Sequence, residues 1–129
     1  MVKERSFPLG CVVLIYIDYR KEQHSEAGFS KLLENVASLS VTLAEEKVIH
    51  MAAWYEEKNE RIVRWRVADE EDACDMVWNL MEIQPCRDAE KARICYEDAF
   101  RGQEFAGVVT VEGTGMMKKD GQPFDFLRL

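Results

Sequence analysis

The chain has 129 residues, of which 47% are apolar and 32% charged, and its formal net charge is −7. This length suits a single core, so we expect residues 1–129 to form one domain. The acidic balance argues against binding to a nucleic-acid backbone, and no apolar stretch reaches the roughly 18 residues that a membrane-spanning helix needs. The four cysteines form no Cys-x-x-Cys pair and the two histidines lie far apart. This spacing disfavours a zinc site and favours a reduced, cytoplasmic setting.

The first half of the chain alternates apolar runs with one long helical pattern. Residues 11–17 form a continuous run rich in Val and Ile, which is typical of a strand buried on both faces. Apolar or small residues then recur at helical spacing over residues 29–44, with Ser25 as the N-cap. Residues 48–55 predict a second strand. Residues 61–67 alternate apolar and charged side chains, which predicts an edge strand paired with the second strand as an antiparallel hairpin.

The second half predicts two helices and two further strands. Asp69 caps a helix with an acidic first turn. Its expected buried stripe is Ala73, Val77, Leu80 and Met81. Asp88 caps a third helix that stops at Gly102. Residues 105–111 predict another strand buried on both faces, KKDGQ predicts a turn, and FDFLRL a last short strand.

This order predicts an α/β fold with three layers and a mostly parallel sheet that carries an antiparallel edge hairpin. The strands over residues 11–17 and 105–111 are expected at its centre. In open α/β sheets, ligands bind at the carboxyl ends of the central strands. Asp18 and Glu112 follow those two strands, so we expect both acids on one rim, with Arg20 and Glu22 in the loop beside them.

Four segments of the chain resemble a von Willebrand factor A-like domain: VVLIYIDYRKEQ, LLENVASLSVTLAEEKVIHMAAWYEE, DEEDACDMVWNLMEIQ and FAGVVTVEG. More narrowly, the chain is similar to an uncharacterised bacterial group of such domains, often found beside MoxR-type AAA+ ATPases. The resemblance spans about residues 5–115. It implies a partial von Willebrand factor A-like fold within a longer parent protein that is often membrane-anchored.

The resemblance also implies a degenerate metal-ion-dependent adhesion site. In metal-binding members, the first loop reads Asp-x-Ser-x-Ser and the fourth strand ends in Asp, often followed by Gly. Asp18 and Glu112 match the two acids, but Arg20 and Glu22 stand at the serine positions. Mg²⁺ prefers near-octahedral oxygen ligands, so these replacements work against binding at Asp18 and Glu112. Alternatively, Arg20 takes the place of the cation and pairs with one of the acids, or loop amides satisfy Asp18.

Two functions remain open at this level. The resemblance implies a non-catalytic protein-interaction or scaffold domain without a cofactor, acting as an adaptor for a protein partner such as an AAA+ ATPase. The alternative is a small hydrolase or nucleotide-binding protein that uses Asp18 and Glu112 with Mg²⁺. That alternative needs a pocket of several hundred Å³ at the rim. No glycine-rich phosphate loop accompanies either acid.

Several other side chains allow two interpretations. His50 fits a hydrogen-bonded core histidine better than a base or ligand. Cys86 precedes a helix, where a thiolate is favoured, or it is an incidental thiol. The three aromatic residues of the predicted hairpin either pack in the core or form an exposed contact patch: Trp54, Tyr55 and Trp65. The three basic residues of the predicted edge strand either prevent pairing with another strand or bind an acidic partner: Arg61, Arg64 and Arg66.

Overall fold

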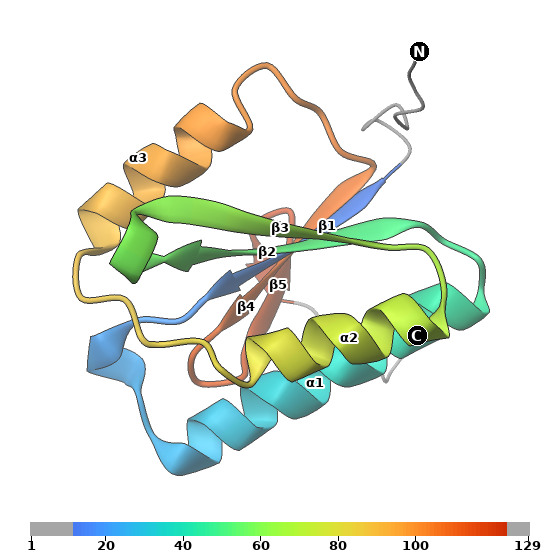
Figure 1. Ribbon diagram of the computed structural model, residues 1–129, viewed down its shortest axis with the longest axis horizontal. Coiled ribbons are helices and arrows are strands. Elements are labelled where there is room, and N and C mark those ends of the chain that lie inside the picture. The colour runs from blue at the N-terminus through green and yellow to red at the C-terminus, as the bar shows by residue number, and fades with distance from the viewer. Residues whose placement is uncertain (1–11, 124–129) are drawn as a thin grey trace.

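The computed structural model describes residues 12–123 of the chain. These residues form an α/β fold built on a mixed sheet, with the strand order β3-β2-β1-β4-β5-β6 (Figure 1). The strands are β1 (Val13–Asp18), β2 (His50–Glu56), β3 (Arg61–Val67), β4 (Gly107–Glu112), β5 (Met117–Lys119) and β6 (Gln122–Pro123). β1 lies between β2 and β4 and is parallel to both. The predicted parallel centre and the antiparallel edge strand β3 are therefore present.

The second edge of the sheet differs from the prediction. β5 and β6 add an antiparallel pair beyond β4, so antiparallel strands flank the parallel core on both sides. The predicted turn between them is present, and Asp120 and Gly121 adopt positive φ angles of 51° and 86° there. The strand predicted from FDFLRL, residues 124–129, lies outside the described residues.

Three α-helices accompany the sheet in the described part of the chain, and each begins where its capping residue predicts. They are α1 (Glu26–Glu45), α2 (Glu70–Leu80) and α3 (Ala89–Ala99). The side chains of Ser25, Asp69 and Asp88 accept hydrogen bonds from backbone amides of the first turns, at 3.0, 2.8 and 3.0 Å. None of the helices in residues 12–123 is long and apolar enough to cross a membrane.

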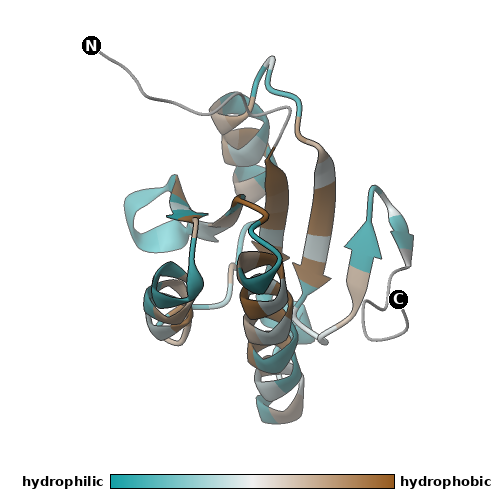
Figure 2. Ribbon diagram, turned by 90° about the vertical axis from the view of Figure 1, so that its right-hand side faces the viewer, coloured by the Kyte–Doolittle hydropathy of each residue, from teal (hydrophilic) through white to brown (hydrophobic). Residues whose placement is uncertain are grey.

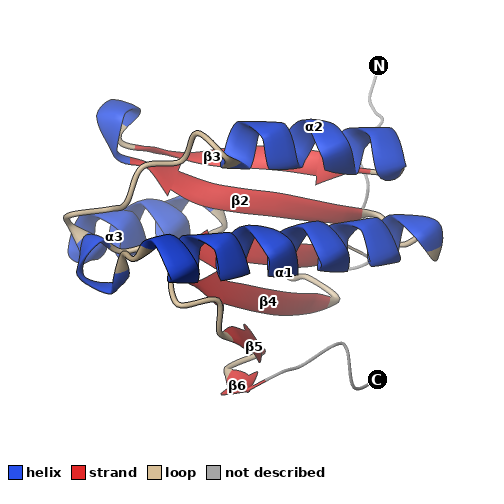
Figure 3. Ribbon diagram, turned by 90° about the horizontal axis from the view of Figure 1, so that it is seen from below, coloured by secondary structure: helices blue, strands red, loops and turns tan. Residues whose placement is uncertain are grey.

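The helices lie on opposite faces of the sheet. Figure 3 shows α1 and α2 side by side on the face toward the viewer, with α3 behind the strands. Alternate residues of β1 point to the two faces because side chains alternate along a strand. Ile15 and Ile17 pack in the larger cluster with α1 and α2, whereas Leu14 and Tyr16 pack with α3. In Figure 2, the apolar colouring is concentrated in the central strands and on the sides of the helices that face them.

β4 is fully buried on one face and only partly on the other, which corrects the prediction of a doubly buried strand. Gly107, Val109 and Val111 are buried on the side of α1, whereas Val108 and Thr110 are partly exposed on the side of α3. The reason is the reach of α3, which packs against β2 and β3 and leaves much of this face of β4 uncovered.

The buried stripe of α2 also differs from the prediction. Ala73, Met76 and Leu80 are the buried residues of this helix. Met81, expected in the core, is 50% exposed, and Trp78 is 69% exposed. By contrast, the aromatic residues of the hairpin belong mainly to the interior: Trp54 and Tyr55 are buried, and Trp65 is half-buried.

His50 is a fully buried, hydrogen-bonded histidine, which agrees with its core interpretation. Its Nδ1 lies 3.0 Å from the carbonyl oxygen of Val48, and its Nε2 lies 2.7 Å from the Ser40 hydroxyl. A carbonyl only accepts, so we assign the proton to Nδ1, which leaves Nε2 to accept from Ser40. Burial lowers the pKa of His50, and the hydrogen bond to Val48 opposes this shift.

Candidate functional site

The carboxyl ends of β1 and β4 form the rim that the sequence predicts. The parallel register places Asp18 directly beside Glu112. Because side chains alternate along a strand, both acids point to the same side of the sheet as Tyr16 and Thr110, the side of α3. The structure thus brings the two acids together, and it adds two hydroxyl groups next to them.

Backbone and side-chain contacts hold the loops of the rim in place. The connection between α2 and α3 lies beside it, because the Cys86 amide donates to the Tyr19 carbonyl and the Lys21 amide donates to the Cys86 carbonyl, both at 2.8 Å. The loop after β4 rests on α1. There, Asn35 Nδ2 donates to the carbonyl oxygen of Gly115 at 2.6 Å.

Gly28 explains how closely the loop after β4 approaches α1. A Cβ atom at this position would stand 2.6 Å from the carbonyl oxygen of Gly113, closer than packed atoms tolerate. Only glycine therefore leaves room for the Gly113 backbone at this point of the helix. The three loops that border the rim are each fixed by backbone contacts.

Each acid of the rim is paired with a basic side chain of the chain itself. Arg20 Nε lies 3.1 Å from Asp18 Oδ1, and Lys118 Nζ lies 3.1 Å from Glu112 Oε2. Arg20 Nη1 reaches Glu22 Oε1 at 3.9 Å. The hydrogen bond to Asp18 raises the pKa of Arg20 above its ordinary value. These side chains are partly exposed to solvent, so each pair contributes at most about 1 kcal/mol to stability.

A pocket of about 250 Å³ adjoins the rim on the side of α3. It is lined by Tyr16, Asp18, Arg20, Ala89, Ala92, Arg93, Tyr96 and Thr110. The ring of Tyr16 meets the ring of Tyr96 edge to face, with centroids 4.6 Å apart. Burial, and next the negative charge of Asp18, raise the pKa of Tyr16 above its ordinary value, so its phenol stays protonated at neutral pH.

The residues of the rim do not fit a Mg²⁺ ion. The two hydroxyl ligands that the metal-binding pattern requires are replaced by Arg20 and Glu22. The guanidinium of Arg20 already contacts the Asp18 carboxylate, and the Lys118 ammonium contacts Glu112. Within residues 12–123, no group of three or more His, Cys, Asp or Glu side chains is arranged to hold a metal ion.

Lys118 is a rim residue that the sequence reasoning missed. The segment around it reads as a turn because Lys118 directly precedes Lys119-Asp120-Gly121. In the structure, Lys118 belongs to β5 and lies opposite Thr110 of β4. An alternation of apolar and polar side chains after β4 could have indicated this strand. β5 has only three residues, which is too short for such a pattern to be recognised.

Cys86 lies beneath the rim and is not a thiolate site. The residue is buried, and burial raises the pKa of its thiol, which overrides the effect of the nearby helix start. The Glu57 carboxylate occupies the backbone amides at this point, accepting from Arg87 and Asp88 at 3.0 Å each. This contact ties the hairpin turn to the loop before α3.

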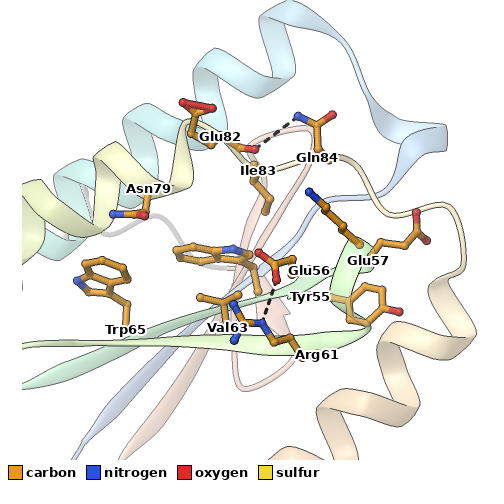
Figure 4. A pocket seen from close by; sticks show the side chains of 12 residues that line it. Tyr55, Glu56, Glu57, Arg61, Val63, Trp65, Asn79, Glu82, Ile83 and Gln84 are labelled. Atoms are coloured by element: carbon orange, nitrogen blue, oxygen red, sulfur yellow. Dashed lines mark hydrogen bonds and ion pairs between the residues drawn. The ribbon is translucent and has the colours of Figure 1, made fainter.

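A second hollow, of about 350 Å³, lies between the hairpin and the end of α2 (Figure 4). The figure shows Val63 and Trp65 rising from β3 toward it, with Ile83 opposite. Arg61 closes one side and pairs with Glu56 at 2.9 Å. On the other face of β3, the guanidinium of Arg64 lies over the Phe100 ring, 5.9 Å from its centroid. Both basic side chains therefore have partners within the chain.

No family model matches the chain, and neither the curated proteins nor the solved structures gave a match.

Proposed function

We propose that this chain is a non-catalytic protein-interaction domain of the von Willebrand factor A-like kind, with Asp18, Arg20, Glu22 and Glu112 in its contact rim. Four features support the proposal. Strand β1 is parallel to β2 and β4, β3 is an antiparallel edge strand, and helices on both faces of the sheet suit a three-layer domain. The two acids share one rim at the expected strand ends.

The observation that carries the non-catalytic reading is the internal pairing of the acids. Asp18 and Glu112 each have a basic partner at 3.1 Å. These acids are then charge-neutralised hydrogen-bonding groups rather than free metal ligands or a catalytic pair. A rim of alternating charges is suited to reading a complementary protein surface, because such charges contribute specificity and association rate.

The proposed partner is a MoxR-type AAA+ ATPase, and binding to it is directly testable. The purified ATPase from the same organism is immobilised with ATP and Mg²⁺, and association is followed by biolayer interferometry. Arg20→Glu and Lys118→Glu are expected to weaken binding about tenfold, because each reverses a charge in the rim. Arg101→Glu, in the exposed turn after α3, is the matched control. Absence of binding by the unaltered chain, or equal weakening by the control, contradicts the proposal.

A second measurement separates this function from a metal-dependent one. Mg²⁺ and Mn²⁺ are titrated calorimetrically into the folded chain and into Asp18→Asn. We expect no saturable binding in either protein, because the donor set at the rim is incomplete. Tight binding that Asp18→Asn abolishes would restore the metal site.

The alternative of a small hydrolase or nucleotide-binding protein has one observation in its favour. The pocket of about 250 Å³ beside Asp18 is large enough for a small ligand and carries three hydroxyl side chains, from Tyr16, Tyr96 and Thr110. Turnover of p-nitrophenyl phosphate or of its diester with Mn²⁺, above that of Asp18→Ala, would favour this alternative. Equal rates for the two proteins would end it.

A further inference from the structure

An apolar groove runs between the outer surfaces of α1 and α2, away from the rim. Its lining includes Ala37 and Val41 from α1, Cys74, Val77 and Trp78 from α2, and Met81, the C-cap of α2, around a hollow of about 190 Å³. Trp78 and Met81 are two of the four large apolar side chains that stand exposed among the described residues. Ile94 lies on α3 and Met116 in the loop between β4 and β5, so within residues 12–123 only this site gathers exposed large apolar side chains.

The groove exists because α2 carries two apolar stripes. Ala73, Met76 and Leu80 face the sheet and are buried. Trp78 and Met81 belong to a second stripe, which faces outward beside α1 instead of packing in the core. An amphipathic helix on a domain surface normally needs one apolar stripe, and a second one with an exposed tryptophan marks a contact surface.

The helices on either side of the groove are rich in acidic residues. Residues 32–46 hold three acidic residues and residues 70–84 hold five, and neither segment contains a Lys or Arg. Lys31 and Lys47 border the first segment, and the Lys31 side chain packs at Gly115 in the loop after β4. The whole chain has a net charge of −7, so these two segments account for its acidity. Glu34 and Glu45 follow the helical spacing of Ala37 and Val41 along α1 and are exposed, and Asp75 stands one turn before Trp78 on α2.

We propose that this groove binds one amphipathic helix of a partner protein, whose apolar face covers Trp78 and Met81 and whose flanks carry Lys or Arg. A helix laid in an apolar groove is an established mode of recognition, and a tryptophan is a frequent energetic centre of such contacts. The acidic flanks repel anionic lipid surfaces. In a twofold contact between two copies of the chain, the same acids would face each other.

The experiment uses a defined probe, a 14-residue amphipathic peptide of Leu and Lys, titrated into the full chain by isothermal calorimetry. Two control peptides accompany it: the same pattern with Glu in place of Lys, and the Leu–Lys composition without helical periodicity. Only the periodic Leu–Lys peptide is expected to bind. Equal binding of the non-periodic peptide would overturn the proposal, because it would show charge attraction alone.

Chain variants locate the binding surface. Trp78→Ala and Asp75→Lys are expected to weaken the peptide at least about tenfold, a loss typical of a central contact. Ile94→Ala and Glu104→Lys are the matched controls, since they truncate a large apolar side chain and reverse an acidic charge at exposed positions elsewhere. Circular dichroism verifies folding of each variant. Equal affinity of all four variants overturns the proposal.

Two further outcomes would contradict the proposal by showing that the groove binds something other than a partner helix. Binding to vesicles of phosphatidylcholine and phosphatidylglycerol that depends on Trp78 would make the groove a membrane contact. A dimer in sedimentation velocity that Trp78→Ala dissociates would make it a contact between copies. None of these variants touches the rim, so failure here leaves the proposed rim function to its own tests.

Discussion

Replacing Ser40 by alanine tests the buried hydrogen bond between α1 and β2. The change removes the hydroxyl that lies 2.7 Å from His50 Nε2 and leaves this nitrogen, which is fully buried, without a donor. Leaving a buried polar group unsatisfied costs about 1–3 kcal/mol. Alanine has a higher helix propensity than serine, which returns up to about 0.5 kcal/mol. We therefore expect Ser40→Ala to lower the free energy of unfolding by about 0.5–3 kcal/mol.

The assay is urea unfolding at neutral pH, with Ser38→Ala as the matched control. Ser38 lies on the same helix and is only partly buried, so its replacement shares the propensity gain without the lost hydrogen bond. The double variant Ser40→Ala/His50→Phe removes both polar groups and is expected to recover part of the loss. If Ser40→Ala unfolds at the same urea concentration as Ser38→Ala, the assigned hydrogen bond contributes nothing and the reasoning fails.

Three further predictions use other contacts. Burial lowers the pKa of His50, so the imidazole of the unfolded chain is protonated at a higher pH than that of the folded chain. The free energy of unfolding should therefore decrease below about pH 6.5. Urea unfolding at a series of pH values should show this decrease, and His50→Phe should lack it. Gly28→Ala should cost about 1–3 kcal/mol by thermal denaturation, because its Cβ meets the Gly113 carbonyl, and wild-type stability would contradict this. Iodoacetamide should modify exposed Cys74 before buried Cys86, as read by peptide mass spectrometry; the reverse order would contradict the burial of Cys86.

The sequence allowed good prediction where local chemistry decides the structure. Ser25, Asp69 and Asp88 each begin the helix that their side chains cap, because this preference depends on the backbone of one turn only. The rim followed from topology. A parallel pair of apolar strands brings the residues after them to one edge, which placed Asp18 beside Glu112.

Other features depend on contacts that no local pattern contains. Met76 and Met81 are both apolar and both suit a stripe through Ala73 and Leu80, so only the position of α2 over the sheet decides between them. Arg20 had two carboxylates within reach of its loop. It pairs with Asp18, while Lys118 from β5 takes Glu112. The three-residue strand β5 is too short to be recognised from the sequence, so the pairing of Lys118 with Glu112 could not be predicted.

The contacts of α1 with the loop after β4 have a consequence for engineering this chain. Gly28 and Asn35 are separated by about two turns of one helix, and they hold the loop at Gly113 and Gly115. α1 therefore contacts two surface features: one of its sides packs against the loop after β4, and another lines the groove. Insertions after Glu112 would transfer their strain to this helix, so a library that diversifies the loop must vary Gly28 and Asn35 with it.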